Sequence, residues 1–201
     1  MAIDHVIYAV HDLERTAARL KRDLGLTFSA GGRHPGGTRN AIARLKPTQY
    51  LELLAPEDPS GGDGARGLIE RMAGQEQLVG WAIEVEDIEA VGRRVSRDVV
   101  PGSITLQDGS VRSWRVVYRK DKGFPFFIEY DGGRAPRLAR WSSEAVGNER
   151  FGGFTWIEIA APESEMRGWL GDLSVSIKYV AGEPGIRAVG IEGPDGEVVI
   201  R

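Results

Sequence analysis

An internal repeat constrains this chain of 201 residues more than any other feature. The first copy opens with an apolar run at residues 3–10, continues with a helix capped by Asp12, and ends with three strand candidates, the last at residues 49–54. The second copy repeats this order from a strand at residues 79–85 to a strand at residues 125–130. Each copy therefore reads as a βαβββ unit, and we predict an α+β fold of tandem modules.

A poorer third copy, which lacks the acidic and histidine positions discussed below, is expected in the last part of the chain. Its strands are joined by a turn at residues 193–196, just as a turn at residues 107–110 joins two strands of the second copy. The first connector, at residues 56–67, has a glycine-rich cluster at residues 59–64 and is expected to be mobile. The predicted division is 1–56, 78–131 and 153–201 for the three modules, with linkers at 57–77 and 132–152.

Composition narrows the class of protein. The chain is 41% hydrophobic, carries no apolar run long enough to cross a membrane and no leader-like start, so a soluble cytoplasmic protein is expected. A net charge of −3 argues against nucleic acid or a membrane surface as a partner, and the three arginines within residues 134–140 are read as a solvated connector. With no cysteine, only His, Asp and Glu remain as strong protein ligands for a metal.

The last strand of each of the first two copies carries one carboxylate among bulky apolar residues. Tyr50 and Leu54 share the face of Glu52, and Phe127 shares that of Glu129. A glutamate on a solvent-facing strand would be the ordinary alternative. A carboxylate in apolar surroundings instead needs a cation or strong donors to stay ionised, which favours a ligand role for both.

His5 lies on the opening strand of the first copy, and aligning Asp12 with Asp87 places Gly80 opposite it. Alone, His5 would be read as a hydrogen-bonded histidine near the N-terminus. Together with the two glutamates it is a candidate ligand of a metal that keeps open positions.

Four segments make the chain resemble the vicinal oxygen chelate superfamily, and within it the glyoxalase-like proteins: LGLTF at 24–28, GGRHPGGTRN at 31–40, YLEL at 50–53 and PFFIEY at 125–130. The resemblance covers residues 1 to about 131. It implies that two modules pair into a half-barrel cup and that His5, Glu52 and Glu129 hold a divalent metal ion, with Gly80 as a departure from the fullest ligand pattern. Mn, Co, Ni, Zn, Mg and Fe are the candidate ions, and an oxygen-rich set tilts the choice towards Mn, Mg, Co or Fe.

Further residues are expected around this cup. His34, in a glycine-rich loop after a strand at residues 26–29, is a candidate substrate contact, acid or base, with a plain surface loop as the alternative. Glu52 and Glu129 are also candidate bases if either leaves the metal. An aromatic and cationic wall is expected from the second copy, with a cross-strand surface pair as the alternative. The predicted substrate-binding residues are Arg39, Asn40, Tyr50, Trp81, Arg112, Trp114 and Phe127.

The leading functional prediction is a metal-dependent glyoxalase-like enzyme of lyase, isomerase or dioxygenase type, which chelates a small oxygen-rich substrate in the cup. The alternative is a metal-free protein of the bleomycin-resistance type that binds or sequesters a small molecule. A third hypothesis is a structural or scaffold protein whose unpaired third module pairs with the third module of another subunit. Such pairing predicts a homodimer.

Overall fold

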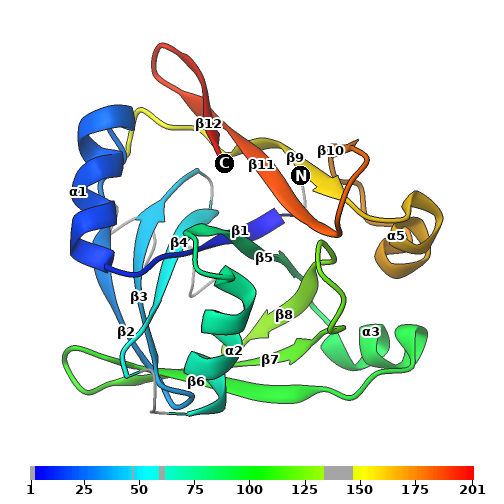
Figure 1. Ribbon diagram of the computed structural model, residues 1–201. Coiled ribbons are helices and arrows are strands. Elements are labelled where there is room, and N and C mark those ends of the chain that lie inside the picture. Colours follow the sequence, from blue (N-terminus) through cyan, green and yellow to red (C-terminus); the bar gives the residue numbers. More distant parts are fainter. Residues whose placement is uncertain (1–2, 47, 59–61, 134–146) are drawn as a thin grey trace.

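The computed structural model describes residues 3–46, 48–58, 62–133 and 147–201, and its centre is an eight-stranded sheet closed into a barrel (Figure 1). The strand order is β1-β4-β3-β2-β6-β7-β8-β5. The first module consists of β1 (Ile3–Ala9), α1 (Leu13–Leu24), β2 (Ser29–His34), β3 (Thr38–Arg44) and β4 (Tyr50–Pro56). The second consists of β5 (Gln77–Glu84), α3 (Ile88–Val95), β6 (Val100–Leu106), β7 (Val111–Val117) and β8 (Phe126–Tyr130). The predicted α+β class and the pairing of tandem βαβββ modules are confirmed.

The two modules join along two seams. In each module the first strand runs parallel to the last, β1 beside β4 and β5 beside β8. The antiparallel pairs β1 with β5 and β2 with β6 then link the modules and close the sheet. The interior face of this sheet is therefore shared by equivalent strands of both modules.

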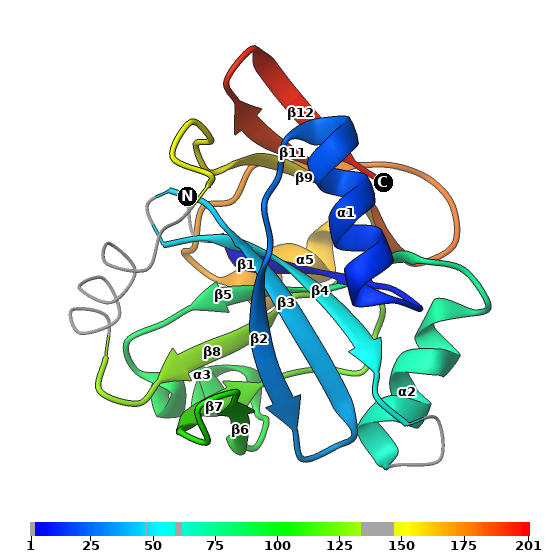
Figure 2. The same cartoon turned by 90° about the vertical axis from the view of Figure 1, so that its left-hand side faces the viewer.

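Helices α1 and α3 begin at the expected caps. The side chain of Asp12 accepts a hydrogen bond from the Arg15 amide at 2.9 Å, and that of Asp87 accepts one from the Ala90 amide at 2.8 Å. Gly25 ends α1 in the left-handed conformation, with φ of 78°. Local sequence signals thus set where these helices begin. Both helices lie outside the barrel (Figures 1 and 2).

The first linker corrects an expectation, because part of it is ordered. Helix α2 spans Asp63–Met72, so it begins within the segment expected to be mobile and continues beyond it, and it buries Ala65, Leu68 and Met72. These residues lie three and four positions apart, so they share one helical face. Two glycines of this segment permit close packing: a Cβ at Gly62 or Gly64 would lie 2.9 or 2.8 Å from the carbonyl oxygen of Gly36.

The expected loop after residues 26–29 is also different, because β2 includes Gly31 and Gly32 and ends at His34. A Cβ at Gly32 would lie 2.2 Å from the carbonyl oxygen of Thr105 on β6. Glycine at this position therefore permits the close seam between the two modules. The basic segment at residues 134–140 lies outside the described residues.

The third module forms its own sheet above the barrel (Figure 1). Its elements have the predicted βαβββ order: β9 (Phe154–Ala160), α5 (Glu163–Leu170), β10 (Ile177–Tyr179), β11 (Gly185–Gly193) and β12 (Gly196–Ile200). The strand order is β10-β9-β11-β12, so β9 runs parallel to β10, the strand after the helix. In the first two modules the opening strand is parallel to the last one, and the expected copy is therefore a match in element order only.

Buried polar and aromatic contacts fix this third sheet to the barrel. Gln49 donates a hydrogen bond to the carbonyl oxygen of Ile3 at 2.6 Å and accepts one from the Phe154 amide at 2.8 Å. On α5, the indole of Trp169 packs against Phe127, with ring centroids 5.4 Å apart. Residues from β1, β4, β8, β9 and α5 thus belong to one continuous core.

Candidate active site

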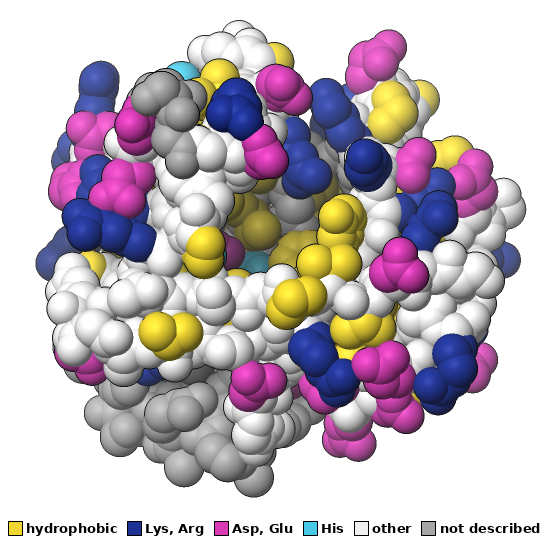
Figure 3. All heavy atoms as spheres, turned by 90° about the horizontal axis from the view of Figure 1, so that it is seen from below, with side chains coloured by type: hydrophobic (Ala, Val, Ile, Leu, Met, Phe, Trp, Pro, Cys, Tyr) yellow, Lys and Arg dark blue, Asp and Glu magenta, His cyan; other side chains and the backbone are white. Residues whose placement is uncertain are grey.

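The interior of the barrel opens on one side into a cavity of about 710 Å³. Seen from below, the molecule is hollowed there, with apolar side chains around the opening and a histidine and an acidic side chain deeper inside (Figure 3). Residues from both modules line the cavity, including His5 and Glu52 from the first and Trp114 and Phe126 from the second.

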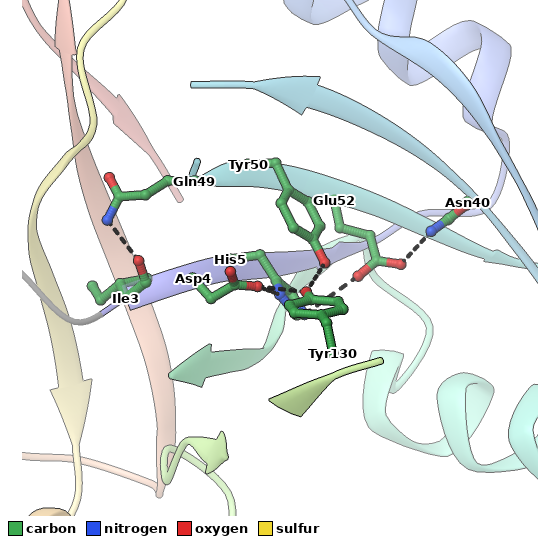
Figure 4. A network of polar contacts seen from close by, with 8 residues as sticks. All are labelled: Ile3, Asp4, His5, Asn40, Gln49, Tyr50, Glu52 and Tyr130. Carbon is green, nitrogen blue, oxygen red and sulfur yellow. Dashed lines mark hydrogen bonds and ion pairs between the residues drawn. The ribbon is translucent and has the colours of Figure 1, made fainter. Parts of the chain in front are cut away.

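Asp4 and His5 both join a polar network at the floor of the cavity, although they are neighbours on β1 (Figure 4). The pairing of β1 with β5 shifts between Ile3 and His5, and such a bulge re-aims the extra residue. Asp4 Oδ2 lies 2.7 Å from His5 Nδ1 and accepts a hydrogen bond of 2.7 Å from the Tyr130 hydroxyl. Because a carboxylate only accepts, Nδ1 of His5 carries the proton and Nε2 is the other reactive atom of the ring.

Glu52 lies beside this histidine and is 6% exposed. Its Oε2 is 3.7 Å from His5 Nε2, while its Oε1 accepts a 2.7 Å hydrogen bond from the Asn40 side-chain amide. The Gly32 amide donates to Asn40 Oδ1 at 2.9 Å, which fixes the orientation of that side chain. A Cβ at Gly31 would lie 1.9 Å from Asn40 Oδ1, so glycine is needed there to make room for Asn40.

Aromatic rings hold His5 in place. Tyr50 stacks on it, with centroids 4.5 Å apart and an interplanar angle of 16°, and Phe126 meets its edge at 5.4 Å. The Tyr50 and Tyr130 hydroxyls are 3.0 Å apart, which connects the stacked tyrosine to Asp4. The imidazole is therefore held by a stacked ring, by a second ring in edge contact and by a carboxylate at Nδ1.

Glu129 does not face the cavity, in contrast to the prediction. Its Oε2 accepts a 2.8 Å hydrogen bond from the Ile88 amide at the start of α3, and its Oε1 binds Arg115 at 2.7 Å. Burial acts to raise the pKa of Glu129, but the Ile88 amide and the Arg115 guanidinium outweigh it, so the pKa lies below its ordinary value. The residues of β8 that line the cavity are Phe126, Ile128 and Tyr130.

Glu129 was expected in the cup because β8 was aligned with β4 in the wrong register. Counting from the caps Asp12 and Asp87, Ile7 corresponds to Ala82, and these two residues pair with Glu52 and Phe126 respectively. Glu52 therefore corresponds to Phe126, and an odd displacement along a strand reverses the face of a side chain.

The expected metal ligands are consequently not brought together. His5 and Glu52 are adjacent, but the second module offers Phe126 opposite Glu52 and Gly80 opposite His5. Within the described residues, no cluster of three or more His, Cys, Asp or Glu side chains has the spacing to hold a metal ion. The donors present thus do not fit the predicted site of three protein ligands.

Five predicted residues outside the metal set line the cavity: His34, Asn40, Tyr50, Arg112 and Trp114. His34 is at the end of β2, where its Nδ1 is 3.0 Å from the Thr38 hydroxyl and its ring meets the edge of Trp114 at 6.1 Å.

Three others lie elsewhere. Arg39 forms a two-bond ion pair with Glu14, at 2.7 and 3.0 Å, which lowers the pKa of Glu14 to about 2. Trp81 is fully buried outside the cavity and donates to the Gly123 carbonyl at 2.8 Å. Phe127 packs against α5 on the outer side of β8. The expected substrate contacts at these three positions are therefore corrected.

Sequence reasoning missed two members of the network, Asp4 and Tyr130. Asp4 had a usable signal, since a charged residue within a buried apolar strand needs a partner. Tyr130 would have followed from placing Phe126 rather than Phe127 on the inner face, because residues two and four positions apart share a face.

The paired modules and their shared cup define a protein with the vicinal oxygen chelate fold. A family model described as a glyoxalase-like domain matches residues 3–174, and the chain belongs to this family. No curated protein matches the chain in sequence.

Two solved structures illustrate the similarity of fold. A hypothetical protein from Staphylococcus aureus matches with a TM-score of 0.68 and 16% identity, over 98% of this chain and 83% of that one. Methylmalonyl-CoA epimerase from Mycobacterium tuberculosis matches with a TM-score of 0.50 and 23% identity, over 69% of this chain and 91% of that one. At these identities the likeness concerns the fold alone.

Among the described residues, no helix has the length and apolar character needed to span a membrane.

Proposed function

We propose that this chain is an enzyme that binds a small carbonyl compound in the cup and transfers a proton at the carbon next to the carbonyl group. The observation that carries the proposal is the buried network Asp4, His5, Glu52 and Asn40 at the floor of the cavity. Burying these polar and ionisable groups opposes folding unless they are paired, and a purely structural core does not require them.

The network divides the chemistry between two groups. Asn40 engages Oε1 of Glu52, while Oε2 is near His5 Nε2. Glu52 would remove the proton from the α-carbon, and the electron pair of that C–H bond would pass into an enolate. His5, whose Nδ1–H is held by Asp4, would carry a second proton at Nε2 and donate a hydrogen bond from it to the enolate oxygen. Return of the proton from Glu52 to the same face of the carbon would complete a proton exchange, and protonation of the opposite face by solvent entering the open cavity would complete an epimerisation.

No step of this reaction passes through a metal ion, because the second module has Phe126 and Gly80 at the positions equivalent to Glu52 and His5. Purified protein stripped of metal is compared with protein given Mn²⁺, Co²⁺, Ni²⁺, Zn²⁺, Mg²⁺ or Fe²⁺. Stoichiometric binding that is lost in Glu52→Ala would restore the metal-dependent reading, whereas activity of the stripped protein supports the proposal.

The second candidate is a protein that binds and sequesters a small molecule without changing it. The apolar side chains of the second module favour this candidate, since Phe126 and Trp114 offer burial and stacking but no chemistry.

A homodimer in the cytoplasm stays a prediction. Light scattering at micromolar concentration measures the mass of the particle and so tests the dimer.

Deuterium incorporation in D₂O, followed by proton NMR, separates the two candidates. Carbonyl compounds with acidic α-protons are incubated with the wild type, Glu52→Gln and the control Glu129→Gln, whose carboxylate lies outside the cup. We expect exchange with the wild type and Glu129→Gln, and a loss of about 100-fold or more with Glu52→Gln. Binding without exchange in the wild type would favour sequestration, and exchange that survives in Glu52→Gln would refute the proposed base.

A further inference from the structure

The two modules contribute different groups of side chains to the cup. His5, Glu52 and Asn40 of the polar network come from the first module, and Tyr130 joins them from the second. The second module also lines the cup with polar residues such as Asp108 and Arg112, and with a set of apolar side chains, here called the apolar wall: Ile104, Leu106, Val111, Trp114, Phe126 and Ile128.

The apolar wall starts at the reacting groups and ends at the rim. Phe126 meets the His5 ring at 5.4 Å, so this end touches the polar network. Ile104 and Ile128 are buried, at 7% and 2% exposure. Val111, at the start of β7, is 62% exposed.

Trp114 is built firmly into this wall. It pairs with Gly102 across β6 and β7, and a Cβ at Gly102 would lie 2.2 Å from Trp114 Nε1. The indole therefore occupies the space above Gly102, and His34 meets it at 6.1 Å. A fixed aromatic surface of this kind binds an apolar group without first having to become ordered.

The size of the cavity points the same way. A volume of about 710 Å³ lies in the range of cavities that enclose drug-sized ligands, and a three-carbon carbonyl compound at Glu52 would leave most of the wall in contact with water. Water-exposed apolar surface is unfavourable by roughly 25 cal/mol per Å², so an occupant with an apolar part fits the cup better.

We propose that the substrate is amphiphilic, with a carbonyl head between Glu52 and His5 and an apolar arm of several carbon atoms that lies along the apolar wall towards Val111. The inference rests on the proposed function, because the residues of that proton transfer place the head. It adds the class of substrate, an alkyl or aryl carbonyl compound, and the direction in which it lies.

A homologous series tests the arm. Straight-chain methyl ketones from 2-butanone to 2-decanone are titrated against the protein by ligand-observed proton NMR. We expect the dissociation constant to fall about fourfold per added methylene while the arm extends along the wall. Val111→Asp should raise the dissociation constants of the long ketones at least about tenfold and leave that of 2-butanone unchanged. The control Val180→Asp makes the same change at a residue of the third module that is 37% exposed, and should alter neither.

The same ketones in the deuterium assay separate this inference from the proposed function. A dissociation constant independent of chain length, or equal effects of Val111→Asp and Val180→Asp, would overturn the amphiphilic substrate even if exchange depends on Glu52. Affinity that rises with chain length and depends on Val111, without exchange that depends on Glu52, would support the amphiphilic ligand and refute proton transfer.

Discussion

Replacing Gly31 by alanine tests how Glu52 is held in position. The new Cβ would lie 1.9 Å from Asn40 Oδ1 and 2.8 Å from its Cγ, so the Asn40 side chain would have to turn away. Both of its hydrogen bonds would then be lost, the one accepted from the Gly32 amide and the one donated to Glu52. The substitution changes neither the base nor the residue that holds it.

The expected loss of stability follows from these two bonds. A bond between neutral groups contributes about 0.5–1.5 kcal/mol and one to a charged group about 1.5–3 kcal/mol. Alanine offsets about 0.4–1 kcal/mol of this by restricting the unfolded chain. We therefore expect Gly31→Ala to lower the free energy of unfolding by about 1–4 kcal/mol, and for a chain of this size each kcal/mol lowers Tm by roughly 2–4 °C. Deuterium exchange that depends on Glu52 should fall as well.

Urea denaturation of a double-mutant cycle measures the coupling. In the Asn40→Ala background the contact between the new Cβ and the Asn40 side chain is gone. Gly31→Ala should therefore lower the free energy of unfolding by less than half as much as it does in the wild type. The matched control is Gly67→Ala in α2, where a Cβ meets nothing within 4 Å, and it should leave stability unchanged or raise it by up to about 1 kcal/mol. Equal costs of Gly31→Ala in both backgrounds would refute the reasoning.

Three further predictions concern residues outside the cup. Glu129→Gln removes a charged acceptor from the first amide of α3 and should lower the free energy of unfolding by about 1–3 kcal/mol without changing ketone affinity; a loss of affinity in the folded variant would contradict its outward position. Gln49→Ala leaves two backbone groups without their buried partner and should cost about 2–4 kcal/mol in urea denaturation, and a cost near zero would argue against this bridge to β9. Because Arg39 lowers the pKa of Glu14 from its ordinary value of 4.5 to about 2, this pair stabilises the fold above pH 4.5 and loses that contribution as the pH falls towards 2. The stabilities of the wild type and Arg39→Ala, measured by urea denaturation, should therefore differ slightly at pH 6 and converge near pH 2, and a constant difference would contradict the assignment.

The tandem modules could be predicted from sequence because their signals are local. Asp12 and Asp87 cap helices, and alternating strands follow each of them at similar distances. Within β4, the two-residue period also placed Tyr50 and Glu52 on one face correctly. These features depend on residues close together in the chain, so distant contacts do not alter them.

The face of Glu129 could not be predicted in the same way. Both faces of β8 are covered, with Phe126 in the cup and Phe127 against α5, so the alternation of polar and apolar residues carried little information. The choice depended on the pairing of β8 with β5, a contact between distant residues. The order of elements in the third module was predicted correctly, and its strand order β10-β9-β11-β12 likewise depends on contacts between distant residues.

The duplicated barrel gives a physical reason why the two halves of the cup differ. Equivalent strands of both modules face one cavity, so a molecule in the cup would contact side chains from both. Placing His5 and Glu52 on a single side lets Asp4 and Asn40 satisfy both, whereas an additional buried carboxylate opposite them would need its own donors. Phe126 at the position equivalent to Glu52 avoids that desolvation penalty and supplies contact area instead. The second module thus presents an apolar ring to the cavity at the position where the first module presents a carboxylate.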